Sequence, residues 1–195
     1  MNLETARRER AAQTPIVPGL PDAPGIRAAM LLTPSIGEHL RGLANALLVD
    51  EFPDSTLSRV ERELLATRVS ANNNCFFCAD SHAAHATALT DGDEKTAQMI
   101  ADVRECNEKS LTPKMRALAD IAILVTDMPS NYEIEREAVQ DALAEGASAG
   151  DVQLTVSIAA AFSMYNRFVD GFRAMTPPDP AAYIRRAEQI TANGY

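Results

Sequence analysis

The sequence contains little cysteine, has a minority of basic residues and lacks a long apolar run. Its 195 residues include three cysteines, which are too few for a disulfide framework. The 18 basic residues are outnumbered by 27 acidic ones, and the net charge of −9 would repel nucleic-acid phosphates and anionic lipid headgroups. No apolar run approaches the roughly 20 residues of a membrane-spanning helix, and the charged N-terminus has no signal-peptide stretch. We therefore expect a cytoplasmic protein that acts on a small molecule, without nucleic-acid or membrane partners.

Hydrophobic residues make up 46% of the chain, which is enough to bury a core of ordinary size. Residues 14–34 contain five prolines, a composition typical of an extended segment. This predicts an extended N-terminal arm over residues 1–34 that lies on the body of the protein. The remaining residues, 35–195, are expected to form a single domain.

Signals for helix starts recur along that domain, whereas strict alternation of apolar and polar residues is hard to find. Three capping boxes are expected, in each of which an acidic residue follows a serine three positions later. They are Ser35 with Glu38, Ser58 with Glu61, and Ser148 with Asp151. Thr112 followed by Pro113 marks a fourth start, because proline at the first helical position loses no hydrogen bond. The pattern predicts an all-α bundle of about eight helices.

A faint internal repeat links residues 57–64 with residues 111–118. Both segments begin with a leucine and a capping residue, and both carry an arginine and a leucine at equal offsets. The repeat predicts two related helical hairpins that pack together. Glu63 in the first copy corresponds to Ala117 in the second, and only the first copy is followed by a cysteine pair. We therefore expect the chemistry in the first hairpin and scaffolding in the second.

The stretch NNNCFFCADSHAAHA, residues 72–86, combines two cysteines with two histidines. Asn74 can cap a helix, and no glycine or proline interrupts residues 75–89, so one helix is predicted there. The side chains that then share one stripe of this helix are Cys75, Cys78, His82 and His85. These four cannot bind one zinc ion, because ten residues of helix rise about 15 Å whereas zinc ligands lie within about 2.3 Å of the ion. A zinc site that combines the cysteines with ligands from elsewhere stays open.

A redox role needs only the two cysteines to lie close together, whereas a zinc site needs four ligands around one ion. Two thiols three residues apart near a helix start can close a disulfide, and the helix dipole there lowers a thiol pKa. His82, one turn after Cys78, can accept or relay the thiol proton. Glu63 is the candidate to orient His82, because it falls in a largely uncharged strip of the preceding helix. Pairing of Glu63 with Arg68 or Arg167 stays open as the alternative.

The stretch SRVERELLATRVSANNNCFFCADSH, residues 58–82, resembles the alkylhydroperoxidase D-like proteins of the carboxymuconolactone decarboxylase-like superfamily. Their pattern is a glutamate, a CxxC pair twelve residues later, and a histidine four residues after the second cysteine. The residues that match it are Glu63, Cys75, Cys78 and His82. A looser similarity extends over about residues 20–175 and is closest to the peroxidase-related branch.

The resemblance implies an all-helical protein that assembles into homo-oligomers, often trimers or hexamers, and reduces organic hydroperoxides with its thiols. Carried onto this sequence, it implies that Cys78 attacks the peroxide and Cys75 closes the disulfide. The proton relay implied is His82 backed by Glu63. A dithiol protein, thioredoxin-like or lipoyl-bearing, would restore the thiols. Neither a metal nor an organic cofactor is implied.

Phe77 departs from the family pattern. The best-known members have a histidine there, immediately before the second cysteine, so one element of their proton relay is missing here. His85 is a possible auxiliary residue, although a place on the helix surface or at an interface is the favoured interpretation. Two other functions stay open: a helical oligomer that senses redox state or binds a partner, and a decarboxylase-type enzyme that acts on a lactone acid and needs no cysteine.

Overall fold

The computed structural model describes residues 3–90, 92–127 and 136–195, and these residues form ten α-helices and no strand. In chain order the helices are α1 (Leu3–Ala11), α2 (Ile26–Leu32), α3 (Pro34–Leu48), α4 (Arg59–Asn72), α5 (Phe76–Ala88), α6 (Glu94–Arg104), α7 (Pro113–Asp127), α8 (Arg136–Ala144), α9 (Ala149–Gly171) and α10 (Pro180–Asn193). The all-α class is confirmed, with slightly more helices than the eight expected. None of the helices described is long and apolar enough to cross a membrane.

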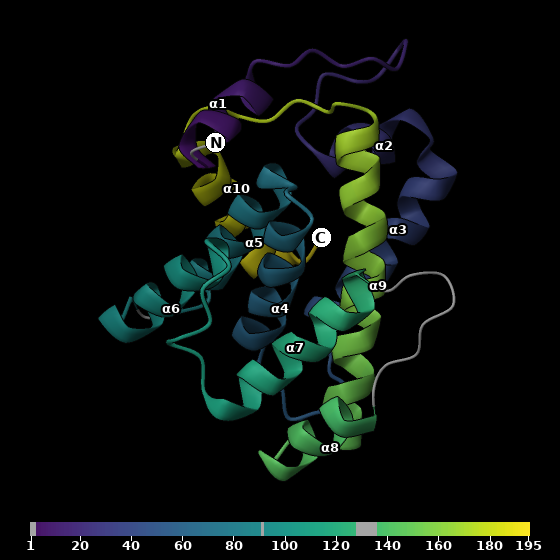
Figure 1. The fold of residues 1–195 in the computed structure, drawn as a ribbon. Helices are drawn as coiled ribbons and strands as arrows, with labels where there is room; N and C mark the ends of the chain where they lie inside the picture. Colours follow the sequence, from purple (N-terminus) through teal and green to yellow (C-terminus); the bar gives the residue numbers. More distant parts are fainter. Residues whose placement is uncertain (1–2, 91, 128–135) are drawn as a thin grey trace.

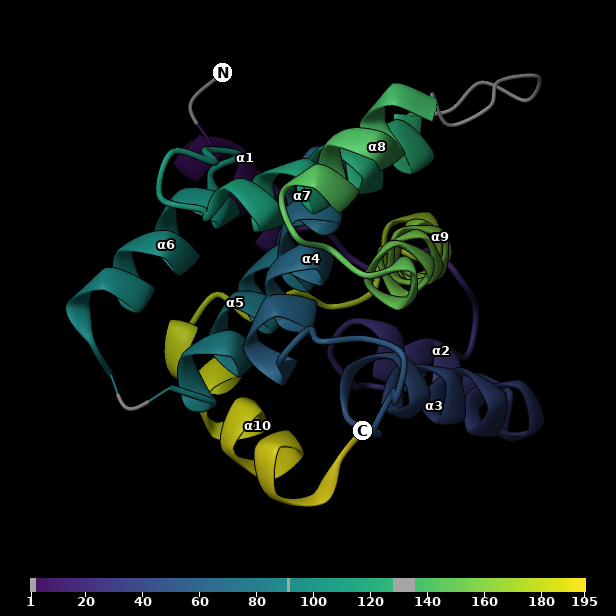
Figure 2. The same ribbon diagram turned by 90° about the horizontal axis from the view of Figure 1, so that it is seen from below.

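Helix α4 lies inside the bundle and packs against α5, α7 and α9 (Figure 1). Figure 2, which looks nearly along the axis of α9, shows α2 and α3 beside that helix and α10 beside α5. The side chains between these helices are mainly aliphatic, and Leu64, Leu118 and Ile158 have at most 1% of their surface exposed. Burial of each such side chain stabilises the fold by about 2 kcal/mol relative to exposure, so this aliphatic core holds α4 in place.

Three of the four predicted helix starts are confirmed. At α4 the Ser58 hydroxyl accepts a hydrogen bond from the backbone N–H of Glu61, and the Glu61 carboxylate accepts one from the Ser58 N–H. Ser148 and Asp151 form the same reciprocal pair at α9. At α7 the Thr112 hydroxyl accepts a hydrogen bond from a backbone N–H of the first turn.

The fourth prediction, a capping box between Ser35 and Glu38, is wrong. Helix α3 begins at Pro34 with Thr33 in the cap position, so Ser35 already lies inside the helix. The proline explains the shift, because its fixed φ and missing N–H suit the first turn and allow the helix to begin one residue earlier.

The two segments of the internal repeat adopt matching local structures. Arg62 donates from Nε to the Leu57 carbonyl at 3.1 Å, and Arg116 donates from Nη2 to the Leu111 carbonyl at 3.3 Å. Both leucines are buried. The two copies therefore share an arginine that ties the first turn of its helix to the preceding loop.

The N-terminal arm, expected to be extended over residues 1–34, instead contains two helices, α1 and α2. The prolines that suggested an extended chain are confined to residues 15–24 and to Pro34, whereas both helical stretches are free of proline and glycine. Helix α1 is held by an ion pair between Arg10 and Asp170 of α9. The non-helical part contributes Leu20 and Ala23 to the apolar cluster around the two cysteines of α5.

Candidate active site

The cysteine pair lies at the start of α5, where the sequence predicts it. The helix is one residue shorter at each end than the predicted 75–89. Cys75, rather than Asn74, occupies the cap position. Asn74 adopts a left-handed conformation with φ of 57°, which asparagine enters more readily than most residues, and so it belongs to the turn before the helix.

The turn that carries the cysteines is fixed from α9 by Asn166. The side chain of Asn166, which is 1% exposed, accepts a hydrogen bond from Asn73 Nδ2 at 2.9 Å and donates one to Ser70 Oγ at 3.1 Å. The backbone N–H of Cys75 also donates to the Ser70 carbonyl, at 3.0 Å. The end of α4 and the start of α5 are therefore held in one register by a buried polar contact.

Cys75 and Cys78 are free thiols whose Sγ atoms lie 2.8 Å apart, but their surroundings differ. Cys78 lines a cavity, whereas Cys75 has no exposed surface and is not part of the cavity wall. Burial raises the pKa of the Cys75 thiol well above its ordinary value, and the neighbouring Cys78 raises it further. Cys75 is therefore protonated at neutral pH, and Cys78 is the thiol that a small molecule in the cavity can reach.

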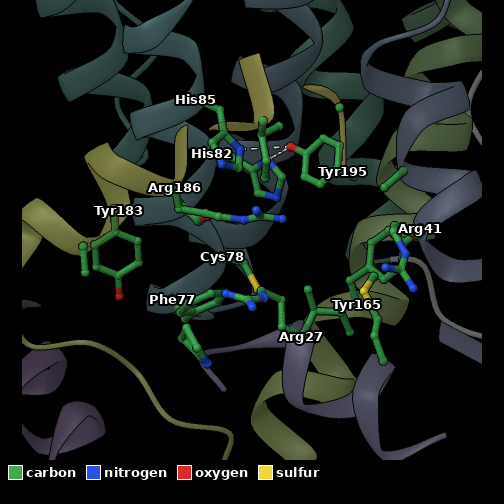
Figure 3. Close-up of a pocket in the computed structure, with 18 of the residues that line it drawn as sticks. Arg27, Arg41, Phe77, Cys78, His82, His85, Tyr165, Tyr183, Arg186 and Tyr195 are labelled. Carbon is green, nitrogen blue, oxygen red and sulfur yellow. Dashed lines mark hydrogen bonds between the residues drawn. The ribbon is translucent and has the colours of Figure 1, made fainter. Parts of the chain in front are cut away.

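Glu63, His82 and His85 meet in one polar network. Figure 3 shows His82, His85 and Tyr195 close to one another in the cavity that Cys78 also lines. The expected contact is present: Nδ1 of His82 lies 2.6 Å from Oε2 of Glu63. The hydroxyl of Tyr195 joins the network, 3.0 Å from Oε1 of Glu63. The same hydroxyl lies 2.9 Å from Nδ1 of His85 and 3.2 Å from Nδ1 of His82. Helices α4 and α5 and the residue Tyr195 thus supply one connected set of proton donors and acceptors.

Glu63 is ionised at neutral pH. Burial acts to raise the pKa of this carboxyl group, but the charges and hydrogen bonds of His82 and His85 outweigh burial and lower the pKa to about 2. A carboxylate only accepts hydrogen bonds, so Nδ1 of His82 carries a proton in the 2.6 Å contact. When the His82 ring is neutral, its Nε2 is therefore the basic nitrogen. The alternative partner Arg68 pairs instead with Glu108, and within the described residues Arg167 forms no ion pair with Glu63.

The favoured interpretation of His85 as a residue of the helix surface or of an interface is wrong, because it is buried within the chain with only 2% of its surface exposed. Burial lowers the pKa of His85 and so favours a neutral ring. Burial, and then the negative charge of Glu63, raises the pKa of Tyr195, which keeps the phenol protonated. With Glu63 ionised, His85 neutral and Tyr195 protonated, the Tyr195 hydroxyl donates a hydrogen bond to Glu63 and accepts one from Nδ1–H of His85. Nε2 of His85 is buried without a hydrogen-bond partner among the residues described.

Glu63, His82 and His85 also offer donor atoms that all lie within 4.8 Å of one another, a set that could hold a metal ion. The Tyr195 hydroxyl already lies at hydrogen-bonding distance from all three side chains, so an ion would have to displace it. Within the described part of the chain, no group of potential metal ligands of this kind includes Cys75 or Cys78.

The cavity next to Cys78 has a volume of about 460 Å³ and lies between α2, α3, α5, α9 and α10. Phe77, which replaces the histidine of the best-known family members, forms part of its wall and packs against Tyr183 with ring centroids 5.7 Å apart. The ring of Phe77 also lies over Gly25, where a Cβ atom would come within 1.8 Å of it. Gly25 has a φ of 57° as well, so both its backbone conformation and this close approach require glycine.

Comparison with known proteins agrees with this architecture. The model of the carboxymuconolactone decarboxylase family matches residues 34–105, which include α3, α4, α5 and the cysteine pair. The resemblance to this superfamily is confirmed. No curated protein matches the sequence significantly.

Two solved structures share the alkylhydroperoxidase D-like fold over most of the chain. An uncharacterized peroxidase-related protein from Silicibacter sp. TM1040 is 23% identical, with a TM-score of 0.67 over 89% of this chain and 93% of that one. An alkylhydroperoxidase AhpD core protein from Ralstonia eutropha JMP134, also described as uncharacterized and peroxidase-related, is 21% identical, with a TM-score of 0.68 over 85% of this chain and 82% of that one. At these identities the comparison establishes the fold.

Tyr195 was not predicted from the sequence. It lies 132 positions after Glu63 in the chain, and an isolated tyrosine has no motif that links it to a glutamate or a histidine. The packing of α10 against α5 brings it to the network, and its backbone N–H donates to the Asn45 side chain on α3 at 2.7 Å. The four residues of the family pattern, by contrast, were all predicted by their spacing. Glu63 contacts His82, Cys75 contacts Cys78, and Cys78 and His82 line one cavity.

Proposed function

We propose that this protein is a thiol-dependent peroxidase that reduces organic hydroperoxides. The observation that carries the proposal is the thiol of Cys78, which lines one cavity with His82 and has the thiol of Cys75 within reach. A thiol with a base nearby and a second thiol behind it is the arrangement that peroxide reduction by a cysteine pair requires.

In the first step, Nε2 of His82 takes the proton of the Cys78 thiol, while Glu63 holds the ring in the tautomer that leaves this nitrogen free. The Cys78 thiolate attacks the terminal oxygen of the hydroperoxide. The O–O bond breaks, an S–O bond forms, and the proton held by His82 passes to the departing alkoxide. The products are an alcohol and a sulfenic acid on Cys78.

In the second step, the Cys75 thiol attacks the sulfenic sulfur and water leaves as the disulfide forms. The short distance between the two sulfur atoms, 2.8 Å, favours this closure over release of the sulfenic acid to other reactions. A dithiol protein, thioredoxin-like or lipoyl-bearing, then reduces the disulfide by exchange. The homo-oligomer, trimeric or hexameric, that the family resemblance implies is part of the same proposal.

A decarboxylase-type enzyme is the second candidate, and the name of the matched family model favours it. That reaction requires no cysteine, so it leaves the placement of Cys78 in the cavity wall unexplained. The redox-sensing oligomer, the third candidate, would form the disulfide without sustained turnover. The test is consumption of cumene hydroperoxide in the presence of dithiothreitol. The peroxidase should consume it over many turnovers, whereas neither the decarboxylase nor the redox-sensing oligomer should.

The division of labour between the cysteines gives a sharper test. Cys78→Ser should abolish peroxide consumption, while Cys75→Ser should permit one turnover and accumulate a sulfenic acid on Cys78, detected by mass spectrometry after dimedone labelling. Cys106→Ser, at the exposed third cysteine, is the matched control and should keep normal turnover. A Cys78→Ser protein that reacts at the normal first-turnover rate would reverse the assignment of roles.

A further inference from the structure

Three arginines line the cavity that contains Cys78, and each comes from a different helix. They are Arg27 on α2, Arg41 on α3 and Arg186 on α10 (Figure 3). No aspartate or glutamate is among the residues that line this cavity. The positive lining contrasts with the chain as a whole, which has 27 acidic and 18 basic residues.

Among the residues that the structure describes, none of the three guanidinium groups has a carboxylate partner. Arg27 and Arg41 form no hydrogen bond or ion pair with any residue that the structure describes, and Arg186 donates only to the Gln189 side-chain oxygen, at 3.3 Å. Burial lowers the pKa of Arg186, and the charges of Arg27 and then Arg41 lower it further, so Arg186 is near enough to both of these cations to be repelled by them. An anion bound among them would attract each guanidinium group and offset this repulsion.

We propose that the substrate of this cavity is an organic hydroperoxide that carries a carboxylate group, which Arg27, Arg41 and Arg186 bind. The proposal rests on the peroxidase function proposed above and specifies its substrate class. The planar guanidinium group pairs with a carboxylate through two parallel hydrogen bonds, which would orient the substrate as well as hold it. The hydroperoxide end would then be directed to Cys78.

The rest of the cavity suits the hydrocarbon body of such a molecule. Met30, Phe77 and Phe162 contribute apolar surface to the same cavity. The volume of about 460 Å³ falls in the range of small-molecule sites, which is about 300 to 1,000 Å³. A molecule with an apolar middle, an anionic end and a hydroperoxide therefore matches the three kinds of surface that the cavity offers.

The kinetic test compares cumene hydroperoxide with its para-carboxylate derivative, which differ only in the anionic group. The protein should show a higher kcat/KM for the carboxylated compound. Each of Arg27→Gln, Arg41→Gln and Arg186→Gln should lower the ratio of the two kcat/KM values by about threefold to tenfold, and the triple variant should remove the preference. Arg185→Gln is the matched control, because it removes the same charge from α10 at an exposed position outside the cavity, and it should leave the ratio unchanged.

Two results of this test would overturn the proposal. If the arginine variants slow both hydroperoxides equally, the arginines act on the thiol or the fold and not on the substrate carboxylate. If Arg185→Gln lowers the ratio as much as Arg27→Gln does, the preference reflects overall charge and not a built site.

A binding measurement separates this proposal from the peroxidase function itself. Isothermal titration calorimetry with 4-isopropylbenzoate, which has no peroxide group, should show binding to the unmodified protein and none to the triple arginine variant. The neutral 4-isopropylbenzamide should bind at least tenfold more weakly than the benzoate, by the loss of charge-assisted hydrogen bonds. Binding of the benzoate without turnover of either hydroperoxide would contradict the peroxidase and support the anion site. Turnover of both hydroperoxides without selective binding of the benzoate would contradict the anion site alone.

Discussion

Glu63 and Asp151 are both buried carboxylates with lowered pKa values, but their partners differ in kind. Asp151, which has no exposed surface, accepts hydrogen bonds from hydroxyl and backbone N–H groups and pairs with a lysine. These partners are Ser55, Thr56, Ser148 and Lys114, the last at 2.9 Å. Burial raises the pKa of Asp151, but these donors outweigh burial and lower it far below its ordinary value. Glu63 is held by two imidazoles and a phenol instead.

The difference in partners indicates a difference in role. The hydroxyl, backbone N–H and ammonium groups around Asp151 join the start of α9 to the loop before α4 and to α7. The chain is tightly packed there, since a Cβ atom on Gly150 would come within 1.9 Å of the Asp54 carbonyl oxygen. The imidazoles around Glu63 can gain and lose protons, and they line a cavity. A buried carboxylate with a lowered pKa therefore indicates an active site only when its partners can exchange protons with a ligand.

The largest effect that follows from this comparison is on catalysis. Glu63→Gln should lower kcat/KM for cumene hydroperoxide by about 10²-fold to 10⁴-fold, because the tautomer and basicity of His82 are no longer set by a carboxylate. The rate is measured per folded molecule, with the folded fraction taken from circular dichroism. Glu61→Gln on the same helix is the control, since glutamine also satisfies a capping box, and it should keep the full rate. A Glu63→Gln protein within threefold of the normal rate would remove Glu63 from the mechanism.

Asp151→Asn should affect stability instead. We expect the free energy of unfolding at pH 7 to fall by about 3 kcal/mol, because Lys114 and the surrounding donors lose the charge that they were arranged to bind. Peroxide turnover per folded molecule should stay unchanged. Urea unfolding measures the first quantity, and Asp141→Asn, at an exposed position on α8, is the control with no expected loss. Loss of turnover in correctly folded Asp151→Asn protein would contradict the structural role.

The loss of stability caused by Asp151→Asn should depend on pH. Asp151 takes up a proton in the unfolded chain below its ordinary pKa of 3.8, whereas the folded protein keeps it ionised to lower pH. The stability that Asp151 contributes is therefore fully present above this pKa and is lost as pH falls below it. The difference between the native protein and Asp151→Asn should narrow by about 1.4 kcal/mol per pH unit once the pH is below that value. A difference that stays constant from pH 7 to pH 2.5 would show that the charge of Asp151 is not what stabilises α9.

The two carboxylates also show how far the sequence alone can lead. Short-range rules found Asp151 as part of a capping box with Ser148, because that contact spans three residues. They did not find Lys114, which reaches Asp151 only after α7 and α9 have packed together. The contact between Glu63 and His82 was predicted because the family pattern relates the two by spacing. All-α class and most helix starts followed from local signals, whereas the helices of the N-terminal arm were missed because nearby prolines dominated its composition.

Tyr195 is the part of the Glu63 site that no local rule could supply, and its removal should have the smallest effect. Tyr195→Phe leaves the Glu63–His82 hydrogen bond in place and removes one donor to the carboxylate, so kcat/KM should fall by about fivefold, the equivalent of about 1 kcal/mol. The loss of that donor should raise the pKa of Glu63, and the acid limb of the pH–rate profile should therefore move to higher pH. Tyr183→Phe is the matched control, because Tyr183 lines the same cavity but its hydroxyl donates to the Pro177 carbonyl, at 3.4 Å. A merely structural role would lower the rates of both variants without moving the acid limb, whereas a shift confined to Tyr195→Phe would place this hydroxyl in the proton network of Glu63.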